Sequence, residues 1–383
     1  MLGPTAFAEV SALVAFATLV FQPFNGVQLV AARDVARLGA AGRGDVVSGY
    51  VRQLFVRTTL VNALVLAVIV AASELLRSWL NLESTAVILL AAVWIVLGTT
   101  LLVCVGVVQG MQRFGEMTWQ LAGPLGALRV VLLPGLVLAA GISGSMLAMI
   151  GATVIGLLTA MRVMGRLLSK RSVEAAPPVR WGMPVAVLIG FSSLVNSDII
   201  FAKASLPGVA AGVYSSAALL GKVALFAPAA LVLVLLPKVA AKLQRGENAD
   251  RMILSTLLMT LAASSLIVIG LALVPSSLIA LTFGPAFVEA RGLLVPLALV
   301  MTVAALLNVH LACAMAAHDN RFVVVVVGAV ILHLTLLSVL HDSAGSIIMA
   351  SAIAIGSAFV TQEALSATGF ARLVVRRLLL RER

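Results

Sequence analysis

The chain has 383 residues, of which 62% are hydrophobic and only 11% are charged, with a mean hydropathy of +1.15. Soluble globular domains hold about 45–50% apolar residues, so the composition excludes a soluble domain and predicts an all-α, polytopic membrane protein. The net charge of +11 does not indicate a nucleic-acid partner, because the basic residues lie in short loops between apolar segments, as the positive-inside rule requires.

Apolar windows of about 20 residues predict about eleven transmembrane helices. In chain order they cover residues 6–29, 58–76, 85–109, 119–141, 146–168, 183–202, 211–236, 252–274, 292–316, 322–341 and 346–369. We divide the chain into an N-terminal lobe at 1–168, a basic cytoplasmic linker at 169–182, a C-terminal lobe at 183–369 and a basic cytoplasmic tail at 370–383. The two lobes are expected to be pseudo-symmetric and to surround a central cavity.

Most of the 26 lysines and arginines fall in loops on one side of these helices. The positive-inside rule makes that side cytoplasmic and predicts a multi-pass protein of the plasma (inner) membrane with a cytoplasmic C-terminus. The basic segment 31–53 is expected to form a short amphipathic helix on the inner leaflet, where its arginines would meet anionic headgroups. The tail has an apolar-basic period and is expected to rest at the same interface.

An internal repeat links the two lobes. A shift of 205 positions places Phe21 and Pro23 on Phe226 and Pro228, and the cations Arg33 and Arg37 on Lys238 and Lys242. Such repeats are frequent in transporters. The second copy begins with the helix at 183–202, which has no counterpart before residue 6, so the sequence predicts that the first lobe lacks its first helix.

Arg129 and Lys222 lie near the middle of their predicted helices, where insertion of a cation costs about 2.5–3.5 kcal/mol. If both face one cavity they would suit a diphosphate, which a guanidinium binds bidentately and an ammonium as a point charge. The alternative is that each pairs with carbonyls or an acid of a neighbouring helix. Pro228 predicts a kink beside Lys222. A pathway for cationic drugs would instead hold carboxylates at this depth, and none is that central.

Further polar residues are candidates for substrate binding. Asn196 and Asp198 either contact substrate or a coupling cation, or serve structure through a bond from Asp198 to Lys203 or to the backbone. Gln22 and Asn25 flank Pro23 and either bind sugar hydroxyls or restore helix hydrogen bonds that the proline breaks.

Other ionisable residues receive less specific interpretations. Arg57, with Arg33, either reaches lipid headgroups or gathers an anionic substrate at the inner entrance. Glu9 and Glu363 are expected to be half-solvated near helix ends, with a proton or ion role as the lesser alternative. His310 and His333 are interpreted as satisfied core histidines rather than proton relays.

The remaining chemistry-bearing residues indicate no enzyme activity and no cofactor. No nucleophile triad, metal-ligand cluster or phosphate-binding glycine loop occurs at a usable spacing. Cys104 and Cys313 both fall in apolar segments, where they are interpreted as small buried residues without a disulfide or metal role.

Several segments resemble polysaccharide-export flippases of the multidrug/oligosaccharidyl-lipid/polysaccharide exporter superfamily, which includes O-antigen and lipid II flippases and the MATE drug antiporters. The resemblance covers nearly the whole chain, and the order of the motifs is more specific than any one of them. The motifs are LGPTAFAEVSAL at 2–13, VQGMQRF at 108–114, SDIIFAKASLPGVAAGVYSSAALLGK at 197–222, LPKVA at 236–240 and TFGPAF at 282–287.

The resemblance implies two six-helix lobes that form a V around a central cavity and move a polyprenyl-diphosphate-linked sugar by alternating access. It also places the LGP motif after a first helix, in agreement with the helix expected to be missing. The expected partners are a lipid-linked oligosaccharide, membrane lipids, and glycosyltransferases or a polymerase of the same pathway.

Two alternatives to a flippase are kept. A cation-coupled multidrug antiporter of the same superfamily would depend on Asp198 or Glu363. A non-transporting membrane scaffold would dock cell-envelope synthesis enzymes through its basic loops and tail.

Overall fold

The computed structural model describes residues 2–41, 44–168, 183–229, 247–317, 319, 321–366 and 372, together with 231, 232, 235, 238, 239, 242 and 245. Every regular element in these residues is a helix, which confirms the predicted all-α class. Helices satisfy their own backbone hydrogen bonds, as a lipid environment demands. Contacts divide the chain into two compact units. Unit 1 is built mainly from Glu9–Ile189, and unit 2 from Gly3–Ala8 and the chain from Gly190 onward.

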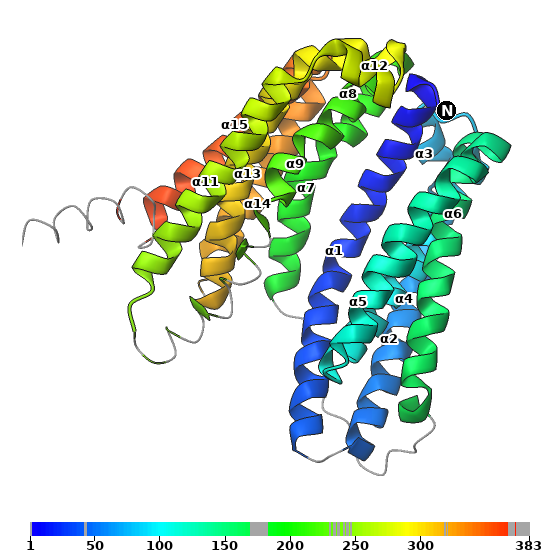
Figure 1. Ribbon diagram of the computed structural model, residues 1–383, viewed down its shortest axis with the longest axis vertical. Coiled ribbons are helices and arrows are strands. Elements are labelled where there is room, and N and C mark those ends of the chain that lie inside the picture. The colour runs from blue at the N-terminus through cyan, green and yellow to red at the C-terminus, as the bar shows by residue number, and fades with distance from the viewer. Residues whose placement is uncertain are drawn as a thin grey trace, which may run out of the picture. The chain divides into compact units, whose positions relative to one another are not determined.

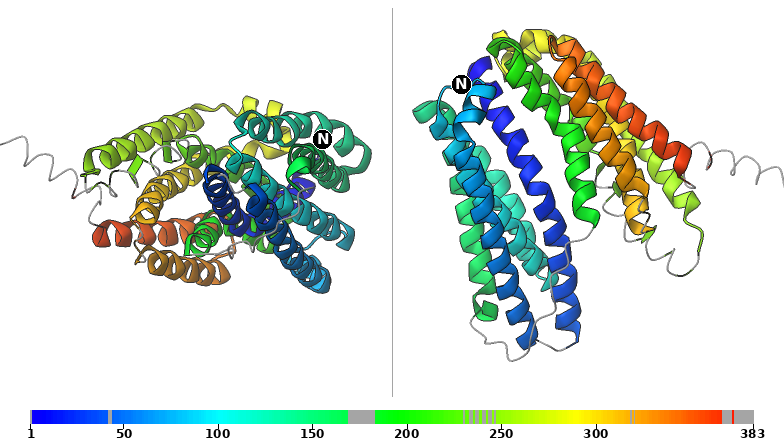
Figure 2. Two further views of the ribbon diagram at one scale, coloured as in Figure 1. Left: turned by 90° about the horizontal axis from the view of Figure 1, so that it is seen from below. Right: turned by 180° about the vertical axis from the view of Figure 1, so that it is seen from behind.

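Unit 1 is organised around α4, which packs against α2, α3, α5 and α6 and, through its glycines, against α1 (Figures 1 and 2). A Cβ added at Gly106 or Gly110 would lie 2.5 Å or 2.7 Å from a carbonyl oxygen of α1, so these two glycines allow the two helices to approach closely. The helices of this unit are α1 (Pro4–Ala40), α2 (Gly44–Ala71), α3 (Ser73–Trp79), α4 (Thr85–Gly110), α5 (Phe114–Ala122), the π-helix η1 (Gly123–Leu128) and α6 (Arg129–Leu168).

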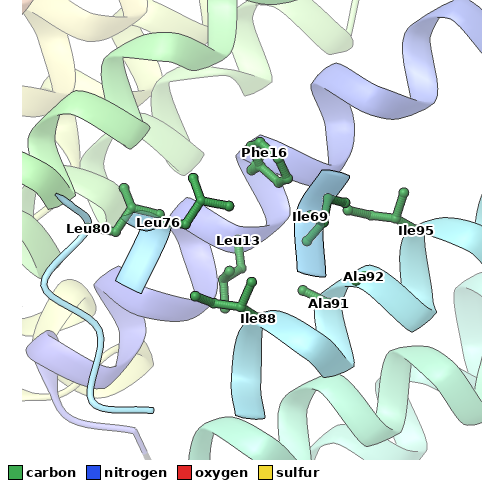
Figure 3. Close-up of a pocket in the computed structure, with 9 residues that line it drawn as sticks. All are labelled: Leu13, Phe16, Ile69, Leu76, Leu80, Ile88, Ala91, Ala92 and Ile95. Atoms are coloured by element: carbon green, nitrogen blue, oxygen red, sulfur yellow. The ribbon is translucent and has the colours of Figure 1, made fainter. Parts of the chain in front are cut away.

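A small apolar void lies among α1, α2, α3 and α4. Figure 3 shows nine apolar side chains that point toward it, among them Leu13, Ile69, Leu80 and Ile95. Its volume is only about 10 Å³ and its lining is wholly apolar. An ordered water needs more room and two or more polar partners. The void is therefore a packing defect of the core rather than a ligand site.

The 40-residue helix α6 folds back on itself. A straight helix of this length would be about 60 Å long, twice the hydrocarbon thickness of about 30 Å. Ala140 and Gly141 leave helical geometry, and Gly141 has a φ of 55°, which glycine adopts without strain. A Cβ on Gly144 would lie 1.8 Å from the carbonyl oxygen of Leu136, so the two arms of α6 are in direct contact.

Unit 2 is organised around α13, which packs against α8, α9, α11 and α15, while α14 packs on α15 (Figure 1). The first turn of α1 belongs to this unit, because Phe7 makes edge-to-face contacts with Phe283 and Phe287 at centroid distances of 5.9 Å and 5.6 Å. The helices are α7 (Met183–Ser205), whose residues before Gly190 belong to unit 1, α8 (Gly208–Gly221), α9 (Val223–Phe226), α11 (Asp250–Leu273), α12 (Ser276–Thr282), the 3-10 helix η2 (Pro285–Ala290), α13 (Arg291–Ala316), α14 (Arg321–Val339) and α15 (Ala344–Leu365).

In the described residues, 10 helical segments are long and apolar enough to cross a membrane. One of them, Phe114–Gly165, holds the two crossings predicted at 119–141 and 146–168. This segment accounts for the difference from the predicted count, because its arms meet at Gly141 without a loop. The kink expected at Pro228 stays a prediction. The break between α8 and α9 lies at Lys222, whose φ of −64° and ψ of −15° remain helical, and α9 ends at Phe226, before Pro228.

The predicted surface helix at 31–53 is wrong. α1 continues to Ala40 and α2 begins at Gly44, so the segment consists of the ends of two long helices. Its apolar residues pack into the core of unit 1, and the Tyr50 hydroxyl donates to Asp34 at 3.1 Å. The predicted linker, 169–182, and all of the predicted tail, 370–383, except Arg372 lie outside the described residues. The lobe boundaries stay a prediction.

Candidate functional site

A pocket of about 300 Å³ in unit 1 brings together three predicted site residues. Gln22 and Asn25 reach it from α1, and Arg129 reaches it from the first residue of α6. Phe21 and Trp94 form an aromatic wall, with ring centroids 5.3 Å apart in an edge-to-face contact. The described residues that line the pocket include no aspartate and no glutamate.

The local sequence explains how the wall and the cation are placed. Gly98 of α4 carries no side chain, and a Cβ there would lie 2.7 Å from the Phe21 ring, so only glycine leaves room for that ring. The segment Gly123–Leu128 forms a π-helix directly before Arg129. Such a wide turn inserts an extra residue into a helix and is frequent at functional sites. It shifts Arg129, the first residue of α6, relative to the preceding helix α5.

Arg129 lacks an ionic partner among the described residues. Its guanidinium carbon lies 5.7 Å from the centroid of the Trp94 ring, a cation–π geometry. Its Nε is buried without a hydrogen-bond partner in the structure. The pocket amides are weakly engaged as well, because Asn25 Nδ2 donates to Gln22 Oε1 at a long 3.4 Å. These donors are available to a ligand.

A second polar site lies inside unit 2. Lys222 is 5% exposed, and its Nζ donates to Asn196 Oδ1 at 2.8 Å. The Asn196 amide then donates to the carbonyl and hydroxyl oxygens of Ser192 at 2.9 Å and 3.2 Å. The lysine is thus held through a hydrogen bond to an amide oxygen of α7.

Asp198 has a different partner from the one considered in the sequence. Its Oδ2 accepts a hydrogen bond from the Tyr214 hydroxyl at 3.0 Å, and its Oδ1 is buried without a partner in the structure. Both side chains are buried. This hydrogen bond connects α7 to α8 and stabilises the packing of these two helices against each other.

The other candidates lie elsewhere. Arg57 is half-buried on α2 and does not line the pocket of unit 1. Glu9 was expected to be half-solvated, but it is 1% exposed, because it lies between the buried residues Ala8 and Ala12 of α1. Arg129 belongs to unit 1 and Lys222 to unit 2, and their sharing of one cavity stays a prediction.

Both histidines have a partner at one ring nitrogen. His310 Nε2 lies 2.7 Å from Glu363, and His333 Nε2 lies 3.0 Å from Ser351. The Nδ1 atom of each ring is buried without a hydrogen-bond partner in the structure. Each histidine therefore connects its helix, α13 or α14, to α15.

No protein-family model and no curated protein sequence matches the chain. Solved structures do match. An inward-facing multidrug resistance MATE family transporter of the MOP superfamily has a TM-score of 0.76 at 12% identity, over 99% of this chain and 92% of the other. This chain has the MATE transporter fold. The match confirms the expected two-lobed membrane architecture.

Two further transporter structures are similar to this chain. An outward-facing multidrug resistance MATE family transporter has a TM-score of 0.60 at 14% identity, over 100% of this chain and 90% of the other. A MOP superfamily transporter from Pyrococcus furiosus, whose binding pocket is described as having reverse polarity, has a TM-score of 0.62 at 14% identity, over 98% of this chain and 88% of the other.

Within this MATE fold, the pocket of unit 1 has the composition of a binding site. It is mainly apolar and aromatic, with a small number of polar groups that could fix the orientation of a ligand. Sequence reasoning found the polar groups but missed Phe21 and Trp94. The sequence feature that could have indicated Trp94 is its position inside a predicted transmembrane span, four residues before Gly98.

Proposed function

We propose that this protein is a transporter that flips a polyprenyl-diphosphate-linked oligosaccharide from the cytoplasmic to the outer face of the plasma membrane by alternating access. Solved MATE-fold transporters with both inward-facing and outward-facing conformations support the alternating-access part. The observation that carries the cargo assignment is the pocket of unit 1, in which Arg129 stands without an acidic partner among the described lining residues.

The energetics favour an anionic cargo. A buried N–H group without a hydrogen bond costs about 1–3 kcal/mol, and a cation at membrane depth costs about 2.5–3.5 kcal/mol on insertion scales. A diphosphate would offset both costs, because it accepts charge-assisted, bidentate hydrogen bonds from a guanidinium. The cation–π contact with Trp94 keeps the planar group in place until the anion arrives.

The neutral part of the pocket suits a sugar. The amides of Gln22 and Asn25 offer both donors and acceptors to hydroxyl groups. The rings of Phe21 and Trp94 offer flat apolar surface for the carbon-bound faces of a sugar ring. On this proposal the cargo undergoes no covalent chemistry, and the basic loops and the C-terminus lie in the cytoplasm.

The alternative is a cation-coupled multidrug antiporter. Two observations favour it. Two of the matching structures are described as multidrug transporters, and Asp198 has a buried oxygen without a partner among the described residues. On this alternative Asp198→Asn abolishes resistance to cationic drugs, and Arg129→Ala does not.

The test is translocation of a labelled polyprenyl-diphosphate oligosaccharide in proteoliposomes. Arg129→Ala should lower the rate at least tenfold, since a lost charged hydrogen bond in a dry site is worth about 1.5–3 kcal/mol. Arg129→Lys should retain part of the rate as a point charge. Arg162→Ala, at an exposed position on the same helix α6, is the matched control and should leave the rate unchanged. An unaltered rate in Arg129→Ala would remove the cargo assignment.

A further inference from the structure

A groove of about 590 Å³ runs between α14 and α15 in unit 2, separate from the sites described above. Its α14 wall is one helical stripe that begins at Arg321 and reaches Leu332 through Val325 and Gly328. Its α15 wall includes Ala358. Both helices are long and apolar enough to cross the membrane, so the groove lies at membrane depth.

Small side chains keep the groove open. Gly328 and Ala329 on α14 face Ser357 and Ala358 on α15. A Cβ added at Gly328 would meet nothing within 4 Å. The absence of a side chain there is therefore not required by close helix packing, and the space is free for a ligand.

The groove has one charged end. Arg321 is the charged residue among the described residues that line it. Its guanidinium makes no hydrogen bond or ion pair with the described part of the chain, although its backbone N–H donates to Asp319 Oδ1 at 3.0 Å. An exposed cation at the start of a transmembrane helix lies at the height of lipid headgroups, where it attracts phosphate.

The length of the groove corresponds to one leaflet. At a rise of about 1.5 Å per residue, Arg321 and Leu332 lie about 16 Å apart along α14. Half of a hydrocarbon core of about 30 Å is about 15 Å. A ligand whose anionic group lies at Arg321 would therefore extend an apolar chain to the bilayer midplane and no further.

We propose that this groove binds one acyl chain of an anionic phospholipid, with the lipid phosphate on Arg321. The one-leaflet length favours a phospholipid over the longer polyprenyl chain of the proposed cargo, and the cationic end favours an anionic over a zwitterionic headgroup. On the orientation predicted from the charges, the lipid comes from the cytoplasmic leaflet. The proposal does not depend on the transported substrate.

The test is native mass spectrometry of the purified full-length protein titrated with phosphatidylglycerol or phosphatidylcholine. Arg321→Gln should weaken phosphatidylglycerol binding roughly tenfold, as expected for loss of a charged hydrogen bond. It should weaken phosphatidylcholine binding less, because the choline cation already offsets the charge of that phosphate. Gly328→Leu should weaken binding of both lipids, because its side chain fills the groove. The folded state should persist in Gly328→Leu, because leucine has the higher helix propensity and space is available.

The matched controls are Arg251→Gln and Gly356→Leu. Arg251 is an exposed arginine at the start of α11, and Gly356 is an α15 glycine with open space at its Cβ that does not line the groove. Both control variants should bind phosphatidylglycerol and phosphatidylcholine as tightly as the unaltered protein does. Equal binding of the two lipids, or unchanged phosphatidylglycerol binding in Arg321→Gln, would overturn the proposal. So would displacement of phosphatidylglycerol by a polyprenyl phosphate at equal concentration, because the groove would then belong to the cargo.

Discussion

Arg129 and Lys222 are both held at membrane depth, but by different chemistry. Arg129 rests on an aromatic ring and has a buried N–H without a partner in the described part of the chain, whereas Lys222 has a hydrogen bond of 2.8 Å to Asn196. The first arrangement leaves binding capacity for a ligand. The second satisfies one of the three ammonium donors within the protein, so Lys222 stabilises the packing of α7 as well as carrying charge.

Removal of the amide partner should therefore destabilise unit 2. Asn196→Leu leaves the buried Lys222 ammonium without its hydrogen bond, which should lower the free energy of unfolding by about 1–3 kcal/mol. Thermal unfolding in detergent measures the loss. The double variant Asn196→Leu/Lys222→Met should be more stable than Asn196→Leu, because the buried ammonium that lost its hydrogen bond is no longer present. If the double variant unfolds at a lower temperature than Asn196→Leu, the hydrogen bond between Lys222 and Asn196 is not what stabilises this site.

The sequence indicated the cations but not their surroundings. Arg129, Lys222 and Asn196 stand out because polar residues are costly in apolar segments. Trp94 and Tyr214 do not stand out, because aromatic residues are ordinary in such segments. That Trp94 contacts Arg129, or that Tyr214 donates to Asp198, depends on how separate helices pack, which no local pattern records.

Helices were predicted best where nearly the whole helix is apolar. The predicted spans 85–109 and 252–274 agree closely with α4 and α11. α1 extends well beyond its predicted end, and α2 begins well before its predicted start, because hydropathy detects only the part of a helix in contact with lipid. The arginines after residue 31 resembled a loop, yet Val35 and Leu38 between them are buried in the core of unit 1.

Close contact between α1 and α4 should make Gly106 sensitive to substitution. A Cβ at this position would lie 2.5 Å from the carbonyl oxygen of Gln28, so Gly106→Ala must separate the helices, and overpacking of this kind costs about 1–3 kcal/mol. Gly135→Ala is the control, because nothing lies within 4 Å of a Cβ there. A lower unfolding temperature is expected for Gly106→Ala alone. Equal temperatures for the two variants would show that this contact is looser than described.

At the scale of the whole molecule, the sequence predicted two halves but not where the first turn of α1 belongs. Gly3–Ala8 belongs to unit 2, because Phe7 packs with Phe283 and Phe287. Those aromatic residues are far from Phe7 in sequence, and hydropathy treats α1 as one apolar segment. Only the folded chain shows that α1 contributes to both units.

The predicted orientation can be tested with single cysteines. Asn248 before α11 and Asp342 between α14 and α15 are exposed, whereas the native Cys104 and Cys313 are buried and should react slowly. A membrane-impermeant maleimide should label Asp342→Cys in intact cells and Asn248→Cys only after permeabilisation, because the basic loops are predicted to be cytoplasmic. The opposite pattern would invert the orientation. Labelling of both variants in detergent is the control for reactivity.

The reversal of α6 at Gly141 joins two predicted membrane crossings without a connecting loop. Because Ala140 and Gly141 carry the whole turn, an epitope inserted there would disturb the ends of both arms, unlike one inserted in a flexible loop. We expect that neither arm is held across the bilayer until the other has formed beside it. During synthesis, the pair should therefore leave the insertion machinery as a single hairpin.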